Sequence, residues 1–240
     1  MKRTDFTLKP SLIAMLAAAT LLTACGDDND DDTAVVTPPA PVMQTFTVTV
    51  TNLTANQPMS PVILASHASD AMLWNAGEMA SEALEKMAEG GDTADIAALS
   101  VINSSVNGTG LLMPGMSETL TLTLDEAEVA SISLATMLVN TNDAFTGINS
   151  YTIAGMEVDA TTAMKFMAYD AGTEANSEAK GTMPGPADGG EGFNASRDDV
   201  DFVHIHPGVI SMYDGLADSV LDASHRFDNP VLAVTIMRTE

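Results

Sequence analysis

Apolar residues alternate with threonines at the start of the chain's main body, between residues 44 and 53. There Phe46, Val48 and Val50 occupy every second position. Successive side chains of a strand point to opposite faces of a sheet, so this period of two predicts a strand with one buried face. The alternation returns at 119–124. Apolar stretches with turn residues between them predict further strands at 129–139, 149–153, 165–169, 202–205 and 231–238.

A helical pattern interrupts these strands over residues 76–99. Strong helix formers run from Ser81 to Ala88, and Gly90-Gly91 ends the run. The segment 92–95 can cap a second short helix that continues to Leu99. Several short strands with glycine- and aspartate-rich turns predict a mainly β fold, an antiparallel β-sandwich with a small helical insert.

The first 24 residues have the pattern of a cleaved leader. Three basic residues precede an apolar stretch at 12–22, which is too short to span a bilayer comfortably. The stretch ends in Leu22-Thr23-Ala24-Cys25 and resembles the bacterial lipobox, in which the cysteine is acylated and anchors the protein in a membrane. A plain secretory signal with a chance cysteine is the alternative. Cys25 is the only cysteine, so its acylation would leave the folded body without a thiol.

Residues 25–43 are expected to be an acidic, proline-rich tether, and residues 44–240 the folded domain. Five aspartates lie between 27 and 32, and three prolines between 38 and 41. Mutual repulsion and the polyproline II preference both favour an extended spacer. Gly26 stands where enteric bacteria place aspartate to retain a lipoprotein in the inner membrane. The expected location is therefore the outer membrane of the cell envelope, facing the periplasm or the exterior.

The charge of the chain limits its partners. It has 33 acidic and 9 basic residues, a formal net charge of −24. Nucleic acids need a basic face to neutralise their phosphates, so we expect no nucleic-acid partner. Direct electrostatic docking on anionic lipid is disfavoured for the same reason. Attraction of cations is favoured, although acidity also simply keeps a surface protein in solution.

Several motifs together resemble the spondin amino-terminal domain, a family found in animal matrix proteins and in many bacterial exported proteins. The resemblance covers about residues 44–240. The matching segments are the opening strand 46–53, His67-Ala-Ser-Asp70 with Trp74, the helix and Gly90-Gly91-Asp92, Val139–Gly147, Tyr169–Glu174, and Asn229–Ile236. The most specific of them read Asn-Asp-x-Phe-x-Gly and Asp-Ala-Gly-Thr-acid.

The resemblance implies an antiparallel β-sandwich with one calcium ion held in loops at one end, and a role in adhesion without catalysis. Asp143 and Asp170 match aspartates of the two specific motifs. Glu174 replaces a second aspartate, which keeps the carboxylate on a longer arm. Some members take a further ligand from the preceding strand, for which Asp125 is the nearest acidic candidate.

The residue types themselves also suit calcium, which prefers 6–8 oxygen ligands. Asp170 and Glu174 flank Ala171-Gly172-Thr173, where the glycine allows a sharp turn that brings both carboxylates together. Asp143 follows a predicted strand in a turn-prone run and can approach from a neighbouring loop. The alternative is that these acids cap turns and stay solvated.

Two groups of histidines are candidates for other chemistry. His204 and His206 are two apart on a predicted strand and so share a face, and Asp199 or Asp201 could complete a zinc-type site with them. The favoured interpretation is instead a strand end with polar histidines facing a loop. His67 and Asp70 are expected to form a hydrogen-bonded pair in a loop.

The motifs of common enzymes are missing. The sequence has no Gly-x-Ser-x-Gly elbow, phosphate loop or dinucleotide fingerprint, and one tryptophan is too few for typical sugar subsites. The glycine-rich segment 181–201 is expected to be mobile, or else to hold a second cation. We expect a calcium-binding adhesion module whose ligand is an envelope or extracellular protein or glycan, and not an enzyme. The alternatives are a structural envelope protein without a functional metal, and a hydrolase that uses His67, His204 or His206.

Overall fold

The alternating strand that opens the main body lies inside a four-stranded antiparallel sheet. β1 (Met43–Asn52) lies between β4 (Ser117–Asp125) and β10 (Leu232–Arg238), and β7 (Thr161–Phe166) pairs with the other side of β10. The computed structural model describes residues 40–240. The predicted signal peptide, Cys25 and the predicted tether up to residue 39 lie outside the described residues.

The side chains of β1 explain its position. Phe46, Val48 and Val50 are completely buried, whereas the threonines between them face outward. On that outer face, the hydroxyls of Thr49 and Thr119 are 2.8 Å apart, and other hydroxyls pair in the same way along the strand. Cross-strand hydroxyl pairs stabilise neighbouring strands, so both faces of β1 favour this pairing.

The second sheet has six strands, also all antiparallel. In spatial order they are β3 (Ile102–Asn107), β2 (Ile63–His67), β5 (Ser131–Met137), β6 (Ala144–Thr152), β8 (Ala168–Asp170) and β9 (His204–Ile205). Buried apolar residues of both sheets form one core, for example Phe46 and Ile236 with Leu64 and Leu134. The predicted mainly β sandwich is confirmed.

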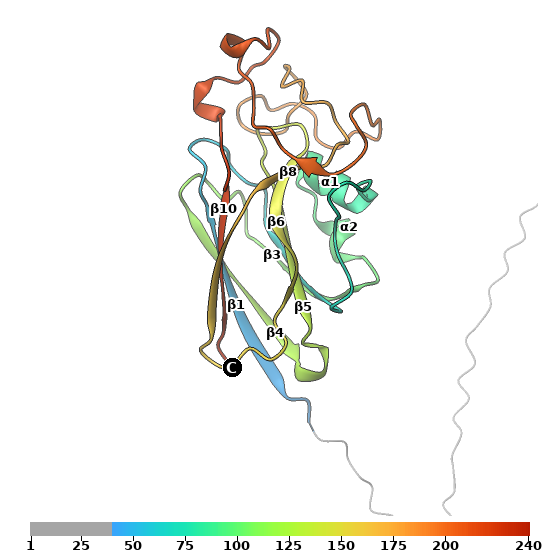
Figure 1. Ribbon diagram of the computed structural model, residues 1–240, viewed down its shortest axis with the longest axis vertical. Coiled ribbons are helices and arrows are strands. Elements are labelled where there is room, and N and C mark those ends of the chain that lie inside the picture. Colours follow the sequence, from blue (N-terminus) through green and yellow to red (C-terminus); the bar gives the residue numbers. More distant parts are fainter. Residues whose placement is uncertain (1–39) are drawn as a thin grey trace, which may run out of the picture. The chain divides into compact units, whose positions relative to one another are not determined.

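Two helices pack on the six-stranded sheet, on the side away from the other sheet (Figure 1). They are α1 (Glu82–Gly90) and α2 (Ala94–Ala97). The Ser81 hydroxyl accepts a hydrogen bond from the Leu84 amide, and Gly91 ends α1 with φ 69°. Residues 76–81 are not helical, so the helix predicted from residue 76 was too long. None of the helices within residues 40–240 has the length and apolar character needed to cross a bilayer.

Long loops gather beyond one end of the six-stranded sheet, near β8 (Figure 1). They include two short 3₁₀ helices, η2 (Met212–Asp214) and η3 (Ala223–His225). A third, η1 (Glu126–Glu128), follows β4 directly. Methionine, valine and leucine side chains give these loops a small core of their own, which contains Met183, Val209 and Leu221. The loops are therefore packed parts of the domain, and they supply part of the site described next.

Candidate metal centre

Strand pairing brings together the acids that lie far apart in the sequence. β8 lies between β6 and β9, and Asp170 pairs with Ala144 on one side and with His204 on the other. Asp143 directly precedes Ala144. The register therefore places Asp143, Asp170 and His204 side by side at the end of three neighbouring strands.

Asp143 is completely buried and only partly satisfied. Its Oδ2 accepts hydrogen bonds from the Thr173 amide at 2.8 Å, the Thr173 hydroxyl at 3.2 Å and the Glu174 amide at 3.1 Å. Its Oδ1 is buried and has no partner among the described residues. Burial and the negative charge of Asp170 raise the pKa of Asp143 well above its ordinary value. Asp143 thus has one oxygen, Oδ1, that is free to bind a cation, and it is repelled by the negative charge of Asp170.

Asp170 is also completely buried, with both oxygens engaged. Oδ1 accepts from the Gly172 amide at 2.8 Å and Oδ2 from the Asn176 side chain at 2.7 Å. Gly172 has φ 70°, and a Cβ there would lie 2.3 Å from the carbonyl oxygen of Phe202. The glycine of the Asp-Ala-Gly-Thr run is therefore required by both its conformation and the close approach of the next loop.

Glu174 points into a second acidic group. Its Oε1 accepts from the Asn142 side chain at 3.1 Å, and its Oε2 is buried without a partner within residues 40–240. Burial, with smaller contributions from the carboxylates of Glu89, Asp198 and Glu191, raises the pKa of Glu174 to about 7. Glu89 lies on α1 with one oxygen also unpartnered, and burial raises its pKa too. Glu89 could not be identified from the sequence, because nothing in a helical pattern marks which glutamate turns inward.

The structure does not bring Asp125 to this group. Asp125 ends β4, and its Oδ1 caps η1 by accepting from the Ala127 amide at 3.0 Å. The chain then enters β5, whose first residue pairs with Thr152 at the far end of β6. The site lies at the other end, at Ala144. The length of β6, at about 3.3 Å per residue, therefore separates Asp125 from Asp143 and Asp170 by about 25 Å.

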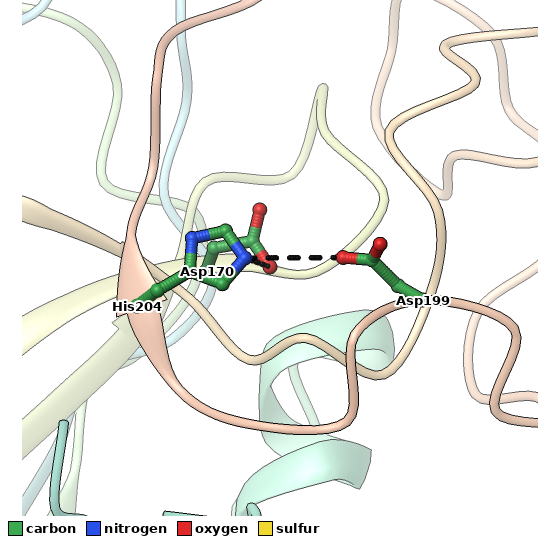
Figure 2. Close-up of side chains that lie close together, drawn as sticks. All are labelled: Asp170, Asp199 and His204. Atoms are coloured by element: carbon green, nitrogen blue, oxygen red, sulfur yellow. Dashed lines mark ion pairs between the residues drawn. The ribbon is translucent and has the colours of Figure 1, made fainter. Parts of the chain in front are cut away.

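The His204 ring faces the carboxylates of both Asp170 and Asp199 (Figure 2). The Nε2 atom of His204 lies 3.3 Å from Oδ1 of Asp170 and 3.9 Å from Oδ2 of Asp199. One ligand atom from each of these three residues lies within 4.8 Å of the other two. The histidine and Asp199 side chains keep 29% and 23% of their exposure, whereas Asp170 has none. The three residues form an open-sided group that a cation can reach.

His206 is buried instead of facing a loop, contrary to the favoured interpretation of the sequence. Its Nδ1 accepts from the Gly208 amide at 3.0 Å, so Nε2 carries the proton and donates to Oδ1 of Asn176 at 3.1 Å. Burial lowers the pKa of His206 to about 4. His206 is therefore a neutral residue that positions Asn176, which in turn holds Asp170.

His67 does not pair with Asp70, so that prediction was wrong. It lies on β2, completely buried, and its ring nitrogens contact the Ala68 carbonyl at 2.7 Å and the Ser133 hydroxyl at 2.8 Å. Asp70 is exposed. A buried imidazole between a carbonyl and a hydroxyl connects two strands, which is a structural role.

The segment 181–201, which was expected to be mobile, is tied to the helical side of the domain. The Arg197 guanidinium bonds to Glu85 of α1 at 2.5 Å, to the Ala80 carbonyl at 2.8 Å and to Asp201 at 2.7 Å. Asp198 accepts from the Ala175 amide at 2.9 Å. These contacts fix the loop that carries Asp199.

Comparison with known proteins supports the resemblance seen in the motifs. A family model described as Spondin_N matches residues 49–183, more than half of the chain. The matched range contains Asp143, Asp170 and Glu174 and ends before Asp199 and His204. A comparison with curated proteins found no match.

Proposed function

Because the chain belongs to the Spondin_N family, we propose that it is a binding module of the cell envelope whose loop end is held together by calcium. Its ligand would be an envelope or extracellular protein or glycan. The proposal includes no catalysis and no nucleic-acid partner. Acylated Cys25 would anchor the module in the outer membrane.

The observation that carries this proposal is the set of buried carboxylate oxygens without partners. Oδ1 of Asp143 and Oε2 of Glu174 are both in this state. An unsatisfied buried polar atom costs about 1–3 kcal/mol, and a charged one costs more. A cation bound to Oδ1 of Asp143 would remove that cost there and would screen the repulsion between Asp143 and Asp170.

The donor set fits calcium better than other common cations. Asp143, Asp170 and Glu174 offer carboxylate oxygens, and calcium prefers oxygen ligands. A bound calcium ion would supply positive charge at this point. The residues themselves connect the loop before β6 with the loop after β8, so the ion would hold two loops of the exposed end in one arrangement.

Thermal unfolding tests the proposal on the full chain purified in detergent. We expect the melting temperature to rise by about 3–10 °C between EDTA and 10 mM calcium, for an affinity typical of extracellular modules. Magnesium at the same concentration should give a much smaller shift, because it demands octahedral geometry and dehydrates reluctantly. Equal melting temperatures in calcium and EDTA would show that these acids are turn residues on an acidic surface.

The anchor has its own test. We expect Cys25→Ser to move the protein from the membrane fraction to the soluble fraction, because the thiol that carries the acyl chains is lost. Fractionation of cells that express the wild type and the variant, followed by immunoblotting, measures this. Continued membrane association of the variant would mean that another part of the chain, or a partner, holds it there.

A further inference from the structure

The three residues drawn in Figure 2 include a nitrogen ligand, which an all-oxygen calcium site does not need. His204 and Asp199 both lie outside the part of the chain that matches the family. Their contact with Asp170 is therefore a feature of this chain that the family relationship does not account for.

Hydrogen bonding fixes which nitrogen of His204 faces the carboxylates. Nδ1 lies 3.1 Å from the carbonyl oxygen of Ile205. A carbonyl only accepts, so Nδ1 carries a proton and donates it. In the neutral ring, Nε2 then presents a lone pair to Asp170 and Asp199. Donation of the second ring N–H to a backbone carbonyl is the arrangement typical of metal-bound histidines.

A lone pair that faces two carboxylates is unfavourable unless a cation lies between them. The cation can be a proton on Nε2 or a metal ion. A charge-assisted N–H···O bond is about 2.7–2.9 Å long. Two ligands bound at about 2.0–2.1 Å to a tetrahedral ion are about 3.4 Å apart. The observed 3.3 Å between Nε2 and Oδ1 of Asp170 matches the spacing of two metal ligands, and the 3.9 Å to Oδ2 of Asp199 is too long for a direct hydrogen bond.

Contacts with neighbouring residues fix the orientation of Asp170 and His204 and the segment that carries Asp199. Asp170 is fixed by the Gly172 amide and the Asn176 side chain. The His204 ring also contacts the ring of Phe202, with 5.7 Å between centroids. Asp199 is carried by the segment that Arg197 ties to α1. Ligands that are oriented before the ion binds raise its affinity, and the exposed side leaves room for a fourth ligand.

We propose that Asp170, Asp199 and His204 form a second metal site, which binds a borderline divalent ion of the zinc class and keeps one coordination position open. One imidazole and two carboxylates match zinc, whereas calcium takes oxygen alone. The open position faces solvent, where water or a carboxylate or imidazole of a partner protein can bind. This proposal rests on the proposed function in so far as Asp170 is shared with the calcium site, whereas His204 and Asp199 belong to the zinc site alone.

The test is zinc binding by the full chain carrying Cys25→Ser, so that the single thiol cannot contribute. Competition with a chromogenic chelator gives the affinity, and cobalt substituted for zinc reports the ligands through its visible spectrum. We expect one equivalent of zinc in this background and at least a tenfold loss of affinity in His204→Ala. His225→Ala is the matched control, because His225 lies 3.1 Å from Asp222 and forms no ion pair with a second carboxylate in the described part of the chain. Its zinc affinity should be unchanged.

Asp199→Asn is a second variant, and because its side chain lies in a partly exposed loop it should fold even if His204→Ala does not. It should lose zinc affinity as well. The proposal is overturned if the background binds no zinc, or if both site variants bind as tightly as the His225→Ala control. Calcium melting of the same variants separates the two proposals. Zinc binding without a calcium shift would contradict only the calcium site. A calcium shift without zinc binding would contradict only the zinc site.

Discussion

Asp143→Asn is expected to abolish the calcium shift while leaving the calcium-free protein at least as stable as the wild type. Asparagine keeps the shape, and its oxygen can still accept from the Thr173 and Glu174 amides. It removes a buried charge that lies beside Asp170. The whole rise of about 3–10 °C should disappear, and the melting temperature in EDTA should stay level or increase. Circular dichroism melts in EDTA and in calcium measure both effects.

Asp125→Asn is the matched control for this variant. It makes the same chemical change at the opposite end of the sandwich, and asparagine can still cap η1. Its calcium shift should equal that of the wild type. If Asp143→Asn keeps the shift, or if Asp125→Asn loses it, the ion is not bound where the buried acids lie.

Gly147→Ala is expected to cost at least about 4 kcal/mol, a large part of the roughly 5–15 kcal/mol that stabilises a typical domain. A Cβ at this position would lie 1.8 Å from the carbonyl oxygen of Leu134 and 2.7 Å from its carbonyl carbon. Both atoms belong to the backbone of β5, which is held between β2 and β6 and cannot move away. Thermal or urea unfolding should show a strongly destabilised or unfolded protein.

Gly110→Ala provides the comparison, because a Cβ at Gly110 would meet nothing within 4 Å. Its unfolding should stay within about 0.5 kcal/mol of the wild type, as for other surface substitutions. Similar stability of the two variants would mean that the glycine of the Asn-Asp-x-Phe-x-Gly motif is not required by strand packing. The motif would then need another explanation.

Most strands could be predicted where one face is buried and the other is not. β1 and β4 show this pattern, and their alternation identifies them directly. β2 was missed because it is only five residues long and its buried residues include Ser66 and His67, so it shows neither alternation nor a continuous apolar run. β3 was missed because it is a polar edge strand. The predicted strand 165–169 is two strands, since the chain passes from one sheet to the other at Met167, and no local pattern shows such a change.

The candidate site was predictable only in part. Asp143 and Asp170 stand in recognisable motifs, and the pairing of β6 with β8 explains why they meet. Glu174 and Glu89 depend on how α1 and the loop 171–203 pack, which spacing in the sequence does not reveal. Asp125 was predicted as a ligand but lies at the opposite end, because the sequence does not show at which end of the sandwich a strand stops. The approach of His204 to Asp170 follows from a two-residue strand, too short for a periodic pattern.

Calorimetric titration of calcium into the full chain carrying Cys25→Ser tests whether the buried acids bind the ion. We expect one saturable site in this background that magnesium does not fill, and no saturable heat when Asp143→Asn is added. Heats that do not differ from dilution, or that remain unchanged by Asp143→Asn, would contradict a calcium site at the end of the six-stranded sheet.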